Sequence, residues 1–283
     1  MIMKFTLFLI LAFSTFSFAQ DEKPVSSSSK KGSFSVYWGW NRAMYSNSDI
    51  SFKGNYYDFT LFDVEAMDRQ SKFDLGLYLN PGTITIPQYN LRIGYYLNDK
   101  YEISIGVDHM KYVMRAWQAS TIDGRITNSG TAYDGSYSNA SFMIKPNFLM
   151  LEHTDGLNYI NTEIRRNDKL YNREKLTVSF IEGFGGGVLL PRTNTTLLNN
   201  PRYDQFHLAG FGLGAMIGLN VEFINHIFIQ TELKAGYINM PSIRTTMFKS
   251  DIAKQSFNFL QTNVVFGYRF FAKKRTKNNV IKD

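Results

Sequence analysis

The stretch FHLAGFGLGAMIGLNVEF (206–223) constrains the fold more than any other part of the chain, because its residues alternate in character. Small or polar residues take nearly every second place, at Gly210, Gly212, Gly214, Gly218, Asn220 and Glu222. The positions between them, from Ala209 to Phe223, are all apolar. A period of two indicates a strand, and so many interior glycines disfavour a helix. A long strand with one apolar and one polar face is what a transmembrane β-barrel requires.

Seven further segments alternate in the same way: 33–41, 88–97, 101–113, 156–166, 176–186, 227–238 and 256–271. Their connections are alternately short (98–99, 167–175 and 225–226) and long (42–87, 114–155, 187–207 and 239–255). Barrels with short periplasmic turns and long extracellular loops show this alternation. The sequence therefore predicts an all-β fold, an eight-stranded antiparallel up-and-down transmembrane β-barrel. Glu182 breaks the phase of its strand, which predicts a β-bulge there.

The two ends of the chain have a different composition. Residues 1–20 combine Lys4, an apolar run and a small-residue cleavage site, which is typical of a secretory signal peptide. A polar, flexible lead-in is expected over 21–32, the barrel over 33–271, and a basic periplasmic tail over 272–283. Export through a cleaved signal and a barrel fold together predict the outer membrane of a Gram-negative bacterium.

Aromatic residues are abundant, with 24 Phe and 17 Tyr. Outer-membrane barrels use such residues as girdles at both membrane interfaces. The last strand ends in GYRFF (267–271) and resembles the aromatic-terminated closing strand of these proteins. Over 33–271 the pattern resembles the small barrels of the OmpA and OmpW type. This resemblance implies an architecture and no particular activity.

The inward-facing positions of the expected strands carry many charges. They are Arg92, Glu102, Asp108, Glu163, Arg165, Glu222, Glu232, Lys234 and Arg269. An eight-stranded barrel is just wide enough for its own side chains, and buried charges must be paired. We therefore expect an ion-pair network that plugs the lumen and leaves no open diffusion pore.

A search for catalytic groups yields one weak constellation. Antiparallel pairing of 101–113 with 156–166 could bring Asp108 or His109 near His153 and Asp155, and a histidine oriented by a carboxylate is a general base. Lipid A deacylases of the outer membrane are small barrels with a His/Ser/carboxylate group, but their motif carries a serine on the face of the histidine, followed by Asn-Ala, where Asp155-Gly156 stands here, so their activity is not carried over to this chain. The alternative is that Asp155-Gly156 forms a turn or bulge. With no HExxH motif and no cysteine, no metal or cofactor is expected.

Three functions remain open at this point. The first is a structural or accessory envelope component that acts through its loops or basic tail, with outer-membrane lipid, lipopolysaccharide and an envelope protein as partners. The second is a lipid A-modifying enzyme that uses the His153 region. The third is a narrow channel or a transporter of small hydrophobic ligands. The net charge of +7 is spread along an exported chain, so nucleic acid is not an expected partner.

Overall fold

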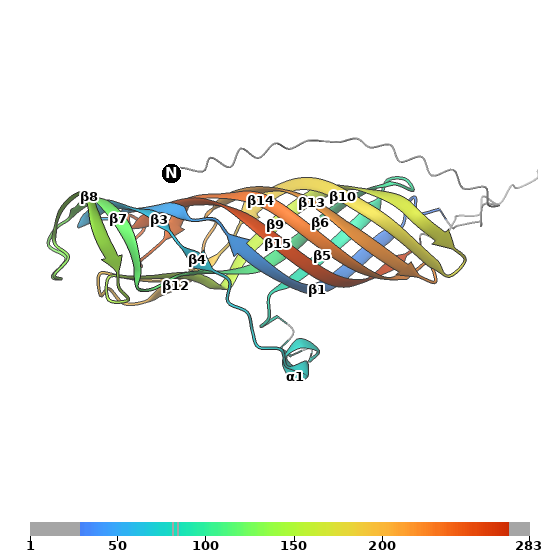
Figure 1. Ribbon diagram of the computed structural model, residues 1–283, viewed down its shortest axis with the longest axis horizontal. Helices are drawn as coiled ribbons and strands as arrows, with labels where there is room; N and C mark the ends of the chain where they lie inside the picture. The colour runs from blue at the N-terminus through green and yellow to red at the C-terminus, as the bar shows by residue number, and fades with distance from the viewer. Residues whose placement is uncertain (1–28, 81, 84, 272–283) are drawn as a thin grey trace, which may run out of the picture.

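A closed ring of strands organises the molecule (Figure 1). The computed structural model describes residues 29–80, 82–83 and 85–271, so the expected signal peptide and basic tail lie outside the described residues. Among these residues eight strands form the ring: β1 (Phe34–Tyr45), β5 (Tyr89–Tyr96), β6 (Tyr101–Met114), β9 (Leu149–Arg173), β10 (Leu176–Leu189), β13 (Gly210–Phe223), β14 (Ile227–Arg244) and β15 (Ile252–Phe270). The ring closes because β1 pairs with β15 on one side and β5 on the other, all antiparallel. The predicted fold class is confirmed.

The two faces of the wall differ as period two requires. On β15 the side chains of Gln261, Asn263 and Val265 are buried inside, whereas Val264 and Phe266 are exposed outside. Exposed apolar residues recur on the outer face of every wall strand, for example Ile93, Ile105 and Leu213. These side chains form an apolar belt around the barrel. No helix in the described part of the chain is long and apolar enough to cross a bilayer.

Two local expectations were wrong. The turn expected over 167–175 is mostly strand, because β9 continues to Arg173 and the turn is limited to Glu174 and Lys175. The bulge expected at Glu182 lies in β9, where Val178 pairs with Tyr171 and Ser179 with Lys169. Leu170 is therefore the extra residue. Glu182 keeps the phase of β10 and faces outward, where it pairs with Arg166 at 3.7 Å. A charged residue at an outward position, not a shift of register, caused the apparent break.

The extracellular segments extend the barrel as further strands. β2 (Ser48–Lys53), β3 (Tyr57–Val64), β7 (Gln118–Ile126) and β8 (Gly135–Ile144) continue the sheet from β15, while β11 (Arg192–Leu197) joins β9 to β12 (Tyr203–Phe206). We call these strands the extracellular extension. Two short elements lie apart from them: β4 (Ala66–Met67), which pairs with β6, and α1 (Leu75–Tyr78), which projects sideways from the barrel (Figure 1).

The glycine at position 236 makes room for an inward aromatic ring. A Cβ atom there would lie 2.5 Å from Cε1 of Phe259 and would also press on the carbonyl oxygen of Leu213. Neither the ring, which is packed in the core, nor the backbone can yield easily. The lack of space for a side chain inside the barrel therefore requires glycine at position 236.

We predict that Gly236→Val lowers the free energy of unfolding by about 1–3 kcal/mol, the usual cost of overpacking. The matched control is Ala235→Val, because Ala235 faces outward on the same strand. Denaturant unfolding of both variants in vesicles measures the difference. Equal unfolding midpoints for the two variants would contradict this account of Gly236.

Candidate functional site

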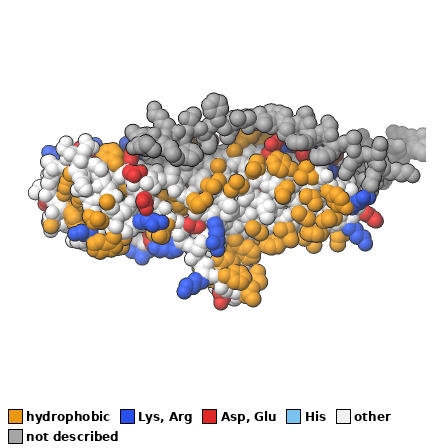
Figure 2. All heavy atoms as spheres, viewed as in Figure 1, with side chains coloured by type: hydrophobic (Ala, Val, Ile, Leu, Met, Phe, Trp, Pro, Cys, Tyr) orange, Lys and Arg blue, Asp and Glu red, His pale blue; other side chains and the backbone are white. Residues whose placement is uncertain are grey.

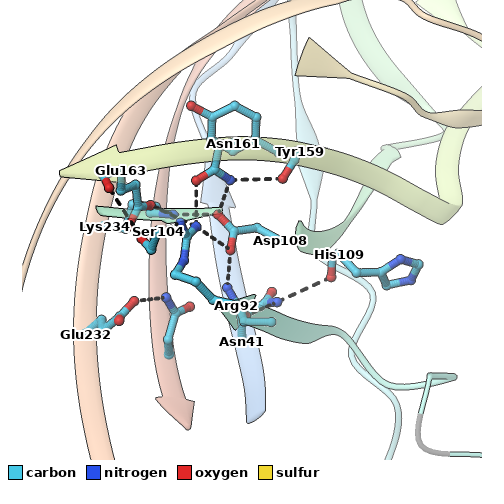
Figure 3. Close-up of polar contacts among 12 residues, drawn as sticks. Asn41, Arg92, Ser104, Asp108, His109, Tyr159, Asn161, Glu163, Glu232 and Lys234 are labelled. Atoms are coloured by element: carbon cyan, nitrogen blue, oxygen red, sulfur yellow. Dashed lines mark hydrogen bonds and ion pairs between the residues drawn. The ribbon is translucent and has the colours of Figure 1, made fainter. Parts of the chain in front are cut away.

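The middle of the lumen holds a compact cluster of six charged side chains, five of which are labelled in Figure 3. Four strands supply them from inward positions at one level: Arg92 from β5, Asp108 from β6, Glu163 and Arg165 from β9, and Glu232 and Lys234 from β14. The register places them within a few positions of one another, since Arg92 is paired with Gly106, two residues before Asp108, and Glu163 is paired with Ser104, four residues before Asp108. We call this set the lumen cluster.

Each charge in the lumen cluster contacts a charge of opposite sign. The Nζ atom of Lys234 lies 2.5 Å from a carboxylate oxygen of Asp108 and 2.5 Å from one of Glu163. Arg165 is 2.6 Å from Glu163 and 2.8 Å from Glu232. Arg92 is 3.1 Å from Glu163. Three cations thus balance three carboxylates, which is the condition for keeping them charged away from water.

Neutral side chains satisfy the remaining hydrogen-bonding groups. The Tyr37 hydroxyl accepts hydrogen bonds from Arg92 (3.1 Å) and Arg165 (2.8 Å) and donates one to Glu232 (3.2 Å). The amide of Asn161 accepts from Arg92 and donates to Asp108. Such connected networks are rigid, because moving one member leaves several others unsatisfied.

A second charged group closes the periplasmic end of the lumen. Arg269 forms an ion pair with Glu222, and the Nζ atom of Lys30 lies 3.7 Å from the same carboxylate. Glu102 accepts a hydrogen bond from Ser35 and interacts electrostatically with both cations. Here two cations balance two carboxylates. We call these four charged residues the mouth cluster.

Lys30 is the member of these clusters that sequence reasoning missed. The nine inward charges expected from the strands comprise five carboxylates and four cations, which leaves one negative charge unbalanced. Lys30, within the lead-in expected to be flexible, supplies the missing cation and is only 4% exposed. Its backbone N–H donates to Asp99 at 2.7 Å, and Gly32 donates to Tyr96. The charge imbalance was the signal that could have pointed to a residue outside the strands.

The four candidate catalytic residues lie in different surroundings. Asp108 belongs to the lumen cluster, and His109 faces outward, stacked on Tyr89 and hydrogen-bonded to Asn158. His153 is buried inside the extracellular half, where its Nδ1 atom lies 2.9 Å from the Thr193 hydroxyl.

Asp155, which would have to orient His153, is directed elsewhere. Its carboxylate is exposed and forms an ion pair with Arg192 at 3.4 Å. Met110 pairs with Leu157 but Tyr112 pairs with His153, so β9 has extra residues at this point, and Gly156 has a φ of 128°. The chain therefore forms a bulge at Asp155-Gly156, the alternative considered for this segment. Within the described ranges no group of three or more His, Cys, Asp or Glu side chains could hold a metal ion.

Comparison with known proteins gives structural likenesses only. No protein-family model matches the chain, and no curated protein sequence does. Among solved structures, the outer membrane protein OprG from Pseudomonas aeruginosa is 11% identical with a TM-score of 0.41, covering 86% of this chain and 98% of its own. The outer membrane protein AlkL is 8% identical with a TM-score of 0.43, covering 92% and 100%. The outer membrane protease OmpT from Escherichia coli is 9% identical with a TM-score of 0.36, covering 84% and 96%.

The membrane location follows from the barrel itself. Its wall is a closed ring, so no strand edge in the ring is left unpaired, and its outer face carries the apolar belt. Short turns join the wall strands at one end and extended segments join them at the other. The protein is an integral outer-membrane β-barrel. Its short turns are periplasmic and its extension is extracellular.

We predict that Lys234→Met destabilises the barrel by about 3–5 kcal/mol, because it leaves Asp108 and Glu163 without their shared cation in a buried site. The control is Lys53→Met, since the Lys53–Asp58 pair is exposed and its loss should leave stability unchanged. Adding Asp108→Asn to Lys234→Met restores equal numbers of each charge and should recover part of the loss. Denaturant unfolding in vesicles measures all three, and a Lys234→Met variant as stable as Lys53→Met would contradict the role of the lumen cluster.

The attachment of the Lys30 segment to Asp99 should depend on pH. Hydrogen bonds from the Ser29 hydroxyl and from the N–H groups of Lys30 and Lys31 lower the pKa of Asp99 below its ordinary value. Because the pKa of Asp99 is lower in the folded protein than in the unfolded chain, its hydrogen bonds to residues 29–31 stabilise this segment fully above the unfolded-state pKa. The stabilisation is lost as the pH falls through the folded-state pKa of Asp99, so release of the segment should begin below about pH 4.

We expect a fluorophore on Lys31→Cys to gain mobility over that acidic range, as measured by anisotropy. In an Asp99→Ala background, which removes the acceptor oxygen, the label should be mobile at every pH. A pH step that survives Asp99→Ala would show that another group holds the segment.

Proposed function

We propose that this protein is a non-conducting outer-membrane barrel that serves as a structural or accessory component of the envelope, presenting its extracellular extension to a protein partner. The observation that supports this most is the filling of the lumen at successive levels. The mouth cluster fills the periplasmic end, the lumen cluster the middle, and apolar side chains the extracellular half. Ion passage would require breaking paired buried charges, which is costly.

The apolar part of the interior is packed like the core of a soluble domain. Phe59 stacks on Phe52 at 5.2 Å between ring centroids and meets Phe148 at 5.5 Å. Tyr112 stacks on Phe257 at 4.9 Å lower in the same core. These rings are almost fully buried, so the extension is a solid body on top of the barrel. A rigid body outside the membrane suits a contact surface better than a passage.

The extension also offers strand edges for a partner. Among the described strands β8 pairs only with β7, and β12 pairs only with β11, so each has one free side. An unpaired edge strand can accept a strand from another chain through backbone hydrogen bonds. Met143 on β8 is 45% exposed, which adds apolar contact area at this edge.

We predict that the purified full chain gives no discrete conductance steps in a planar bilayer, because the paired charges leave no continuous water path. A large-pore porin added to the same bilayer is the positive control. Regular single-channel steps from this protein would overturn the non-conducting part of the proposal.

The accessory role is tested in native envelopes with a thiol cross-linker. The described chain has no cysteine, so Met143→Cys is a single attachment point on β8, and Leu213→Cys on the lipid-facing side of β13 is the matched control. One discrete protein adduct through Met143→Cys, absent with Leu213→Cys, is expected. If neither variant gives an adduct and the barrel purifies alone in mild detergent, the accessory role is wrong.

A further inference from the structure

The wall strand between β1 and β6 is interrupted by a long insertion. Met67 of β4 pairs with Val113, and Tyr89 of β5 pairs with His109. These two pairs are four positions apart on β6, but twenty-two positions apart between β4 and β5. β4 and β5 therefore occupy one strand position, with eighteen more residues between them than the register of β6 needs. We call the described residues of this insertion that lie beyond the wall, 71–80, 82–83 and 85–87, the excursion. It emerges from the side of the barrel and carries α1, rather than crossing the top of two strands as a loop does (Figure 1).

The excursion exposes more large apolar side chains than a water-facing segment normally does. Phe73 is 77% exposed, Leu75 63%, Leu79 60% and Ile86 49%. Its charged residues, Lys72 and Asp74, both stand near its start. In Figure 2 the apolar side chains of this projecting part adjoin the apolar belt of the barrel.

The root of the excursion lies at an aromatic girdle. The ring of Tyr78 is 5.6 Å from that of Trp40, which in turn meets Trp38 at 4.8 Å and Phe266 at 5.9 Å. Trp40 lies just past the middle of β1, counted from the periplasmic end, and faces outward. Tryptophan and tyrosine gather at the level of the lipid headgroups, so the excursion starts at the outer interface of the bilayer.

Internal hydrogen bonds satisfy much of the polar backbone of the excursion. The Asp74 carboxylate accepts from the N–H of Leu77 at 2.9 Å and caps α1. The Thr83 hydroxyl lies 3.1 Å from the carbonyl oxygens of Gly76 and Leu77, and the Tyr78 hydroxyl donates to the carbonyl of Ser71. Backbone groups must be satisfied in this way where water is scarce.

We propose that the excursion inserts its apolar side chains among the lipid acyl chains of the outer leaflet and thereby anchors one side of the barrel at the interface. Continuity with the apolar belt, the position at the aromatic girdle and the satisfied backbone all fit a lipid surface. The proposal rests on the membrane location and does not depend on a protein partner.

The experiment measures how deeply the excursion enters a bilayer of known composition. Single-cysteine variants carry a polarity-sensitive fluorophore, and the folded full chain is reconstituted into phosphatidylcholine vesicles with or without chain-brominated lipid. Leu79→Cys reports on the excursion. Leu213→Cys, on the lipid-facing side of β13, is the positive control. Met247→Cys, in the exposed turn between β14 and β15, is the negative control.

The expected result is quenching at Leu79→Cys several-fold greater than at Met247→Cys and comparable with Leu213→Cys. A second label at Phe73→Cys should behave like the one at Leu79→Cys. If both excursion labels are quenched no more than Met247→Cys while Leu213→Cys is quenched, the excursion stands in water and the proposal is wrong. Absence of quenching at Leu213→Cys as well would overturn the membrane location itself.

Discussion

A ring of eight strands leaves room inside for side chains and for little else, and the rest of the structure depends on this constraint. Every inward position must be filled by a group that its neighbours can accept. Where that group is charged, a partner of opposite sign must reach it from across the lumen, as Arg165 on β9 reaches Glu232 on β14. The outer face has the complementary requirement, because lipid accepts apolar side chains and no unpaired backbone.

The inward side chains change from polar or charged to apolar between one inward position and the next on several strands. On β6 the inward residue changes from Asp108 to Met110, and on β15 from Gln261 to Phe259. On β9 Asn161 is followed by Tyr159, whose ring meets Phe259 at 6.3 Å. Below this level the interior is held mainly by charge, and above it mainly by apolar packing that continues into the extracellular extension, with a few buried polar groups such as Gln255 and Tyr112 hydrogen-bonded to each other. The two halves therefore resist unfolding for different physical reasons, and only the lower one should respond to the loss of a single charge.

The alternation of residues was enough to predict the ring and the inward charges, because period two fixes which face each side chain takes. It could not predict Lys30, since nothing local in residues 29–33 reveals that Asp99, some seventy positions away, holds this segment across the lumen mouth. The bulge was misplaced for a related reason. An outward glutamate such as Glu182 resembles a phase error until its partner Arg166 is known to stand beside it on the next strand.

The excursion was hidden within a long connection because a strand interrupted for eighteen residues has no continuous pattern. The break in the wall between β4 and β5, which we call the seam, stays closed because side chains form hydrogen bonds where a strand partner is missing. The Asp68 carboxylate accepts from the N–H of Ala43 on β1 and from the Gln88 side chain, and Lys111 on β6 donates to the carbonyl of Ile86. These bonds supply partners for edge groups of β1 and for the returning chain, as a membrane wall demands. A sealed seam lets the wall carry an outward insertion without opening a path into the lumen, so the insertion and the plugged interior are compatible in one barrel.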